Sequence, residues 1–284
     1  MAGTPPTIRV RPITDADRQG MIDLLVRCFP QRDDAYWAQA LARMATRTPP
    51  PDALRYGYML EAEARPVGAV LMIMSHSPHA PQLRCNLSSW CIEPAYQLFA
   101  APLVNAALRR RDVTYCNISP APHTVPVIQA QGFARYNQGQ FIAAPALAAW
   151  RRRGHARQSE GDDDGIAPHE RTLLADHAAT GCLCVVAHDG EAAAPFVFQR
   201  LRLDRPTFMR LVYCRDFESL RRCAGALGRF LALRGVLFIA IDAEGPLPGV
   251  PGVFRAGLGP KYFRGPIPPR LGDLSYTEMT VFGP

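Results

Sequence analysis

Residues 84–94, RCNLSSWCIEP, are the stretch that decides the fold. Apolar and polar residues alternate along it as far as Ile92, which predicts a strand, and Glu93-Pro94 predicts a turn directly after it. Residues 98–108 then carry apolar side chains three and four apart, which predicts a helix. Because 113–118 is predicted as a second strand, the order is strand, helix, and parallel or splayed strand. In such a unit the amides that open the helix face outward and suit an anionic ligand.

These residues resemble the GNAT (Gcn5-related N-acetyltransferase) superfamily. In that family an apolar strand runs into a turn of the form Q/R-x-x-G-x-G/A, whose amides bind the CoA pyrophosphate, and a later helix commonly ends in Gly-Phe. Here the strand is Leu87–Ile92, the turn is Gln97–Pro102, and the ending is Gly132-Phe133. With the strand Ile8–Pro12 and the helix that follows it, the resemblance covers roughly residues 8–142.

Two features depart from the family pattern. Ala100 and Pro102 stand where the family has glycine, and a Cβ there crowds the approach of a phosphate. Many family members also place a tyrosine four residues before the Gly of Gly-Phe, and this chain has Ile128. The resemblance therefore implies a reshaped pyrophosphate turn and a general acid that comes from elsewhere.

The resemblance implies acetyl-CoA or another acyl-CoA as donor substrate. The residues expected to bind it end the strand and open the helix: Cys91, Ile92, Gln97, Leu98, Phe99, Ala100 and Ala101. An amide near Cys91 and Ile92 would polarise the thioester carbonyl while a neutral amine attacks it directly. The Cys91 side chain is expected to pack rather than to carry an acyl group, because no histidine stands beside it in the sequence.

Three side chains are candidates for proton transfer. Glu93 ends the strand, as a base or as a cap for the following turn. His123 precedes the helix that ends in Gly132-Phe133, and the ordinary imidazole pKa of about 6.5 suits proton exchange at neutral pH. Tyr136 is a replacement for the tyrosine missing at Ile128. For each of them the alternative is an ordinary structural role.

A composition change divides the chain. Residues 151–166 are charged and glycine-rich, which predicts a surface linker between an N-terminal domain, 1–150, and a C-terminal domain, 167–284. The second part repeats the order strands, helix, strand, with a long helix predicted at Phe217–Leu233. A divergent second GNAT-like unit is expected, with an unrelated α/β domain as the alternative. Carboxylates open the long helix and would repel a phosphate, so the donor site is expected in the first unit.

The predicted fold class is therefore α/β (α+β), with two GNAT-like units, each a mixed, partly splayed sheet flanked by helices. The first half is expected to hold a strand at 8–12, helices at 15–29 and 34–45, strands at 56–61 and 67–74, and a polar loop at 75–82 that carries His76 and His79. The tail from residue 245 onward is rich in Gly and Pro, which predicts few regular elements.

The formal net charge of +7 is spread along the chain rather than gathered in one motif. Lys261 is the single lysine, and the arginines are scattered without interleaved aromatic residues, so nucleic-acid binding is not expected. Four acidic residues of the second half are candidates for holding a cationic acceptor: Asp242, Glu244, Asp273 and Glu278.

The eight cysteines form no CxxC pair, and Cys182 and Cys184 lack a matching His or Cys pair at ligand spacing, so no metal is expected. No apolar run approaches the roughly 20 residues needed to cross a bilayer, and the N-terminus lacks the order of a signal peptide. The expected compartment is the cytoplasm.

Three function classes remain open. The first is an acyltransferase that moves an acyl group from acyl-CoA to an amine or hydroxyl of a small-molecule or peptide acceptor, with acyl carrier protein as a further donor class. The second is a catalytically inactive GNAT-derived binding or scaffold protein. The third is a nucleic-acid-associated protein. The altered turn Gln97–Pro102 separates the first two, because intact amide geometry supports binding even without glycine.

Overall fold

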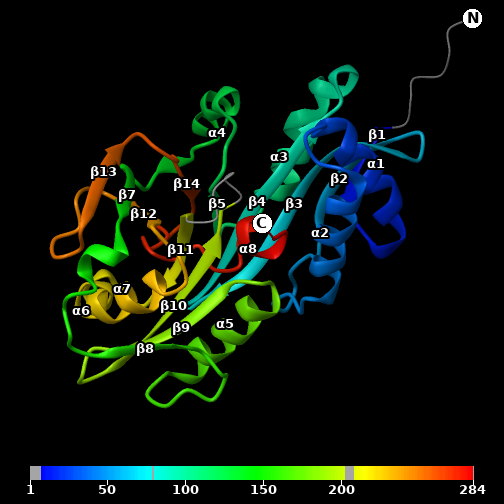
Figure 1. Cartoon of the computed structure of the whole chain (residues 1–284). Helices are drawn as coiled ribbons and strands as arrows, with labels where there is room; N and C mark the ends of the chain where they lie inside the picture. The colour runs from blue at the N-terminus through cyan, green and yellow to red at the C-terminus, as the bar shows by residue number, and fades with distance from the viewer. Residues whose placement is uncertain (1–7, 79, 202–207, 284) are drawn as a thin grey trace, which may run out of the picture. The chain divides into compact units, whose positions relative to one another are not determined.

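The computed structural model of this chain describes residues 8–78, 80–201 and 208–283. The chain divides into two compact units (Figure 1). Unit 1 comprises residues 1–117 and 264–267, and unit 2 comprises residues 118–263 and 268–284.

Helices and strands alternate along the described chain. The helices are α1 (Arg18–Cys28), α2 (Asp34–Thr46), α3 (Ala100–Ala107), α4 (Val125–Ala130), α5 (Pro168–Ala179), α6 (Phe217–Arg222), α7 (Ala224–Ala232) and α8 (Glu278–Val281). The short 3₁₀ helices are η1 (Asp15–Asp17), η2 (Pro94–Phe99), η3 (Pro122–Thr124) and η4 (Pro145–Ala148).

The strands lie in two sheets. They are β1 (Ile8–Pro12), β2 (Gly57–Ala62), β3 (Arg65–Ser77), β4 (Ala80–Ile92), β5 (Val113–Asn117), β6 (Ala134–Arg135), β7 (Gly139–Ala143), β8 (His155–Gln158), β9 (Leu183–His188), β10 (Ala193–Arg200), β11 (Phe208–Cys214), β12 (Phe238–Ala243), β13 (Gly252–Ala256) and β14 (Tyr262–Arg264).

The two sheets follow the same plan. The first runs β1-β2-β3-β4-β5-β14-β6 and the second runs β8-β9-β10-β11-β12-β7-β13. In each, the first four strands pair antiparallel and the fourth pairs parallel with the fifth. A helical connection separates the parallel pair, α3 in the first sheet and α6 with α7 in the second. This mixed α/β architecture of two like sheets confirms the predicted fold class.

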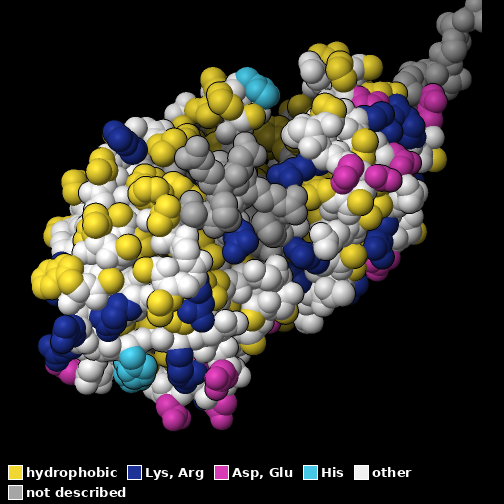
Figure 2. Space-filling view, viewed as in Figure 1, with side chains coloured by type: hydrophobic (Ala, Val, Ile, Leu, Met, Phe, Trp, Pro, Cys, Tyr) yellow, Lys and Arg dark blue, Asp and Glu magenta, His cyan; other side chains and the backbone are white. Residues whose placement is uncertain are grey.

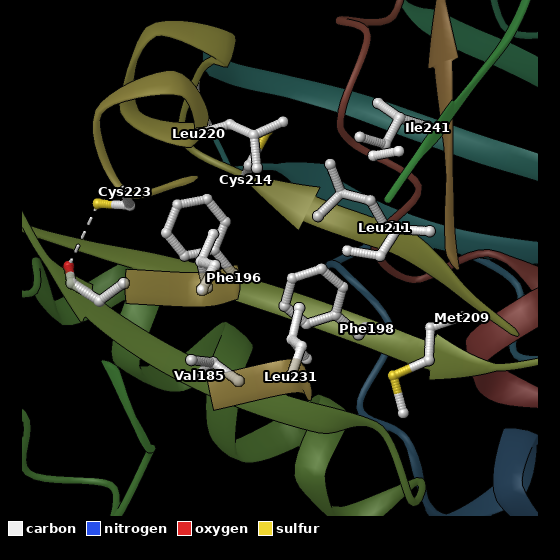
Figure 3. Close-up of a cluster of buried hydrophobic side chains, with 14 of the residues drawn as sticks. Val185, Phe196, Phe198, Met209, Leu211, Cys214, Leu220, Cys223, Leu231 and Ile241 are labelled. Atoms are coloured by element: carbon white, nitrogen blue, oxygen red, sulfur yellow. Dashed lines mark hydrogen bonds between the residues drawn. The ribbon is translucent and has the colours of Figure 1, made fainter. Parts of the chain in front are cut away.

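Unit 2 has its core between the second sheet and α7. Figure 3 shows Val185 of β9 and Phe196 and Phe198 of β10 with Leu231 of α7, all completely or almost completely buried. The rings of Phe196 and Phe198 stack with their centroids 6.4 Å apart. Alternation of side chains along β10 places these two phenylalanines on one face of the sheet, where they exclude water.

The prediction of a polar loop at residues 75–82 is wrong. β3 continues to Ser77 and β4 begins at Ala80, with these two residues paired across the turn. Polar residues here extend a hairpin rather than ending it, because one face of the hairpin is open to solvent. His76 is exposed, while its neighbour Ser75 is buried. The prediction for His79 lies outside the described residues.

Residues 151–166, predicted as a linker, carry β8, which pairs antiparallel with β9. Arg157 and Asp163 form an ion pair at 2.6 Å, and Asp163 is fully buried. Part of the charge that suggested a solvated segment is therefore internal. The two compact units divide between Asn117 and Ile118.

The single long helix predicted at Phe217–Leu233 is divided at Cys223 into α6 and α7. Two glycines of α7 let it approach the backbone of residues 145–151 closely. A Cβ at Gly225 would lie 2.4 Å from the Arg151 carbonyl oxygen, and one at Gly228 would lie 2.4 Å from that of Pro145. α7 therefore packs closely against the backbone that precedes β8.

Candidate functional site

β4 and β5 separate partway along their length. They pair in parallel as far as Asn86 and Cys116, and β4 then continues to Ile92. A β-bulge interrupts the register of β4 with β3 around Ser89, whose φ is 50°. A bulge bends its strand and increases the local twist. Among the described residues, no strand pairs with the end of β4 on the side that β5 has left.

Ile92 presents its backbone amide on this edge. The N–H of Glu93 donates to the Val67 carbonyl of β3 at 2.8 Å, and successive backbone groups of a strand point to opposite edges. The N–H of Ile92 therefore points away from β3. Of the two residues expected to polarise a thioester, Cys91 and Ile92, the geometry favours Ile92.

The segment Gln97–Pro102 is helical rather than an open turn. Ala100 begins α3 with φ −61° and ψ −42°, and its N–H donates to the Gln97 carbonyl. Any residue adopts this right-handed conformation, so the backbone here does not require glycine. The N-cap Phe99 makes no side-chain capping bond and the first turn holds no acidic residue. The positive end of the helix dipole is thus unopposed by local charge.

Two arginines hold Glu93 at the end of β4. Arg65 of β3 donates to both carboxylate oxygens at 2.7 and 2.8 Å, and Arg27 of α1 approaches one of them at 2.9 Å. Hydrogen bonds from Arg65 and then Arg27 lower the pKa of Glu93. The carboxylate is therefore ionised but occupied. No local pattern indicates these partners, because Arg65 lies 28 residues and Arg27 lies 66 residues from Glu93 along the chain.

Cys91 is partly buried, and its thiol hydrogen-bonds to Cys28 at the end of α1. This hydrogen bond and burial raise the pKa of the Cys91 thiol, while the same contact lowers the pKa of Cys28. Raising the pKa keeps Cys91 as a neutral thiol, which is a weak nucleophile.

The other two proton-transfer candidates lie in unit 2, so unit 1 alone does not contain the full predicted set. His123 is an exposed residue of η3, directly before α4. Tyr136 lies between β6 and β7, and its ring meets Phe263 edge-on with centroids 6.1 Å apart. Its backbone N–H donates to the Lys261 carbonyl at 3.0 Å.

Three of the four acidic residues proposed to hold an acceptor have partners within unit 2. Asp242 pairs with Lys261 at 2.9 Å. Asp273 accepts hydrogen bonds from the backbone N–H and hydroxyl of Ser275. Glu278 accepts one from the Ser119 hydroxyl at 2.6 Å. Glu244 is exposed. These contacts indicate structural roles for the first three.

Basic side chains form separate groups on the visible surface rather than one continuous patch (Figure 2). None of the described helices has the length and hydropathy to cross a lipid bilayer. Within the described part of the chain, His, Cys, Asp and Glu side chains nowhere gather in a group of three or more that could hold a metal ion.

Solved structures share this architecture. A putative acetyltransferase from Pyrococcus horikoshii is 13% identical over 98% of this chain and 96% of that chain, with a TM-score of 0.57. A GCN5-related N-acetyltransferase from Kribbella flavida is 12% identical over 91% and 71%, with a TM-score of 0.60. A probable N-acyltransferase from Enterococcus faecalis is 12% identical over 95% and 74%, with a TM-score of 0.57.

No protein-family model matches the sequence, and no curated protein sequence matches it either. At 12–13% identity the likeness shows the fold alone. The chain has the fold of the GNAT acetyltransferases, and its two like sheets fit two GNAT-like units.

Proposed function

We propose that this protein is an acyltransferase that moves an acyl group from acyl-CoA to an amine or hydroxyl of a small-molecule or peptide acceptor. The observation that carries the proposal is the separation of β4 from β5 before η2 and the uncapped helix α3. It combines an outward-pointing strand amide with the positive end of a helix dipole, which suits a ligand with a carbonyl and a pyrophosphate. The acetyltransferases that share the fold support the same reaction class.

The proposed mechanism is direct attack. The Ile92 N–H donates a hydrogen bond to the thioester carbonyl oxygen, which becomes negative as the acceptor nitrogen attacks the carbonyl carbon. The C–S bond then breaks and the CoA thiolate leaves. A base accepts the proton from the acceptor nitrogen and an acid protonates the thiolate, and the sequence pattern makes His123 and Tyr136 the candidates for these two roles. In this scheme the ion pairs of Glu93 with its two arginines fix the position of the connection between β4 and η2.

We place the CoA pyrophosphate at Gln97–Ala101, and we propose that the protein is cytoplasmic. All eight cysteines are free thiols, which is typical of a reducing compartment. Acyl-CoA is proposed as donor ahead of acyl carrier protein, since the fold comparisons give the carrier protein no support.

A scaffold protein without turnover is the second candidate, because the Ala100 N–H is already bonded to the Gln97 carbonyl and is not available to a phosphate. CoA binding separates these two candidates, because acyl transfer requires a bound donor, whereas a scaffold that has lost its pyrophosphate site does not bind one. We expect CoA at 100 times its dissociation constant to stabilise the fold by about 2.7 kcal/mol, measured as a shift in thermal unfolding. An unchanged unfolding curve with CoA, acetyl-CoA and longer acyl-CoA esters would contradict donor binding.

Replacing His123 by alanine should lower turnover by about 100-fold, the lower end of what general acid-base catalysis contributes. The side chain is exposed, so the fold should tolerate the change. Release of the CoA thiol measures the rate. His169→Ala is the matched control, because His169 is also exposed in unit 2 and lies outside the proposed mechanism. Equal rates for the two variants would remove His123 from the mechanism.

A further inference from the structure

Unit 2 repeats the separation of strands seen at β4 and β5. β11 and β12 pair in parallel only from Phe208 to Arg210, although β11 continues to Cys214. A bulge interrupts the register of β11 with β10 beside Val212. The second unit therefore has the same bent strand and the same departure of its parallel neighbour as the first.

Matching the registers identifies the counterpart of the Ile92 amide. In unit 1 the bulge is followed by Cys91, paired with β3, and then by Ile92. In unit 2 it is followed by Tyr213, paired with β10, and then by Cys214. Cys214 thus stands where Ile92 stands, and its backbone N–H is the equivalent donor.

The backbone N–H of Cys214 is already hydrogen-bonded within the chain, to the segment Gly272–Leu274. The Cys214 N–H donates to the Gly272 carbonyl at 2.9 Å, and the Leu274 N–H donates to the Val212 carbonyl at 2.7 Å. Between them Tyr213 and Asp273 form an antiparallel bridge. Residues 272–274 therefore add a short strand to the edge of β11 that β12 has left, by the same backbone pairing with which extended peptides bind open sheet edges.

Contacts on both sides hold this segment in place. Arg270 donates to the Cys214 carbonyl at 2.7 Å. The Tyr276 N–H donates to Nε2 of the buried His177, and the Gln199 amide donates to the Met279 carbonyl. Leu274 itself is 3% exposed. The segment is part of the folded unit rather than a loosely attached tail.

The N-terminus of α6, the helix after β11, is also unsuited to binding an anion. Asp216, the N-cap of α6, accepts a hydrogen bond from the Ser219 N–H at 2.5 Å, and Glu218 adds a second carboxylate in the first turn. The first turn of α3 in unit 1 has neither a side-chain cap nor an acidic residue. In unit 1 a strand edge and a helix N-terminus would hold an acyl-CoA. In unit 2 residues of the chain itself occupy both the strand edge and the helix N-terminus.

We propose that the segment Gly272–Leu274 closes the donor groove of unit 2, so that the chain binds one acyl-CoA and binds it in unit 1. The one-donor part of this inference rests on the proposed function, whereas the closure of the β11 edge is independent of it. Gly272–Leu274 occupies the backbone N–H and carbonyl groups of β11 with which the amide groups of an acyl-CoA would otherwise pair.

Gly272 offers a way to displace the segment. Its φ is 79°, and a Cβ there would lie 2.8 Å from the Cys214 Sγ and 3.1 Å from the Phe217 ring. Gly272→Val should therefore push the segment off β11. Gly257→Val is the matched control, since Gly257 has φ 78° and no heavy atom within 4 Å of the added Cβ. It carries the same backbone strain without the clash.

Hydrogen exchange read by mass spectrometry tests the closure. In the wild-type protein we expect the Cys214 and Leu274 amides to be protected, and Gly272→Val to speed their exchange at least about 10-fold, while Gly257→Val leaves them protected. Fast exchange of these amides in the wild-type protein, or equal exchange in the two variants, would overturn the closure.

Calorimetric titration with CoA tests the stoichiometry separately. One CoA per chain, retained in Gly272→Val, is the expected result. Two CoA molecules per wild-type chain would overturn the inference and leave the proposed function standing. No CoA binding together with protected amides would refute the proposed function and the one-donor statement, and would retain the closure of unit 2.

Discussion

Replacing Ala100 by glutamate should abolish CoA binding, with a dissociation constant raised at least about 100-fold. Ala100 is the first residue of α3 and is half-exposed, so a larger side chain fits without disturbing the core. The new carboxylate would lie where we place the pyrophosphate. Two unit charges about 5 Å apart at a surface dielectric near 20 repel by about 3 kcal/mol, which already exceeds a 100-fold loss.

Titration calorimetry with CoA measures this effect, and Ala100→Gly is its control. Glycine keeps the space open and adds no charge, so that variant should bind CoA as tightly as the wild-type protein or more tightly. Equal binding of CoA by Ala100→Glu and the wild-type protein would place the cofactor elsewhere on the molecule. Thermal unfolding without ligand verifies that both variants are folded.

Local patterning was sufficient to predict the strands that form the centre of each sheet. The strand predicted at 113–118 appears as β5, Val113–Asn117, because its apolar pattern is a property of the strand's own sequence. The helix at 15–29 appears as η1 followed by α1, with its apolar residues buried at three- and four-residue spacing. These elements owe their type to residues within themselves.

The short strands β6, β8, β13 and β14 could not be predicted in this way. In β8, His155–Gln158 has no buried residue, and its pairing with β9 joins segments about 30 residues apart. β13 is largely exposed and becomes a strand because β7 offers an edge. Such strands depend on a partner elsewhere in the chain, so their own composition carries little signal.

The candidate site was predictable as a sequence of elements but not as a geometry. The order of strand, helix and strand follows from periodicity, whereas the bulge at Ser89 has no sequence sign, because serine rarely adopts positive φ. The ion pairs of Glu93 with Arg27 and Arg65 depend on how α1 and β3 reach the end of β4. Distance in the sequence, rather than weak patterning, concealed these contacts.

Removing the charge of Lys261 should destabilise the protein by about 3–5 kcal/mol, the cost of breaking a buried pair at one partner. Lys261, the only lysine of the chain, is 1% exposed, and its Nζ lies 2.9 Å from the Asp242 carboxylate. Gln140 donates to the same carboxylate oxygen at 3.2 Å. In Lys261→Met the Gln140 amide would still donate to this buried negative charge, but a neutral amide does not replace an ammonium group.

Denaturant unfolding measures the loss, and a second substitution identifies its cause. Adding Asp242→Asn to Lys261→Met removes the unpaired charge, so the double variant should recover part of the lost stability. Arg153→Met is the control, because Arg153 forms a 2.5 Å ion pair with Glu191 in which both side chains are more than two-thirds exposed. That change should cost less than about 1 kcal/mol. If Lys261→Met costs no more than the control, the buried pair does not hold the start of β14 against β12, and the charge of Asp242 must be balanced by other groups.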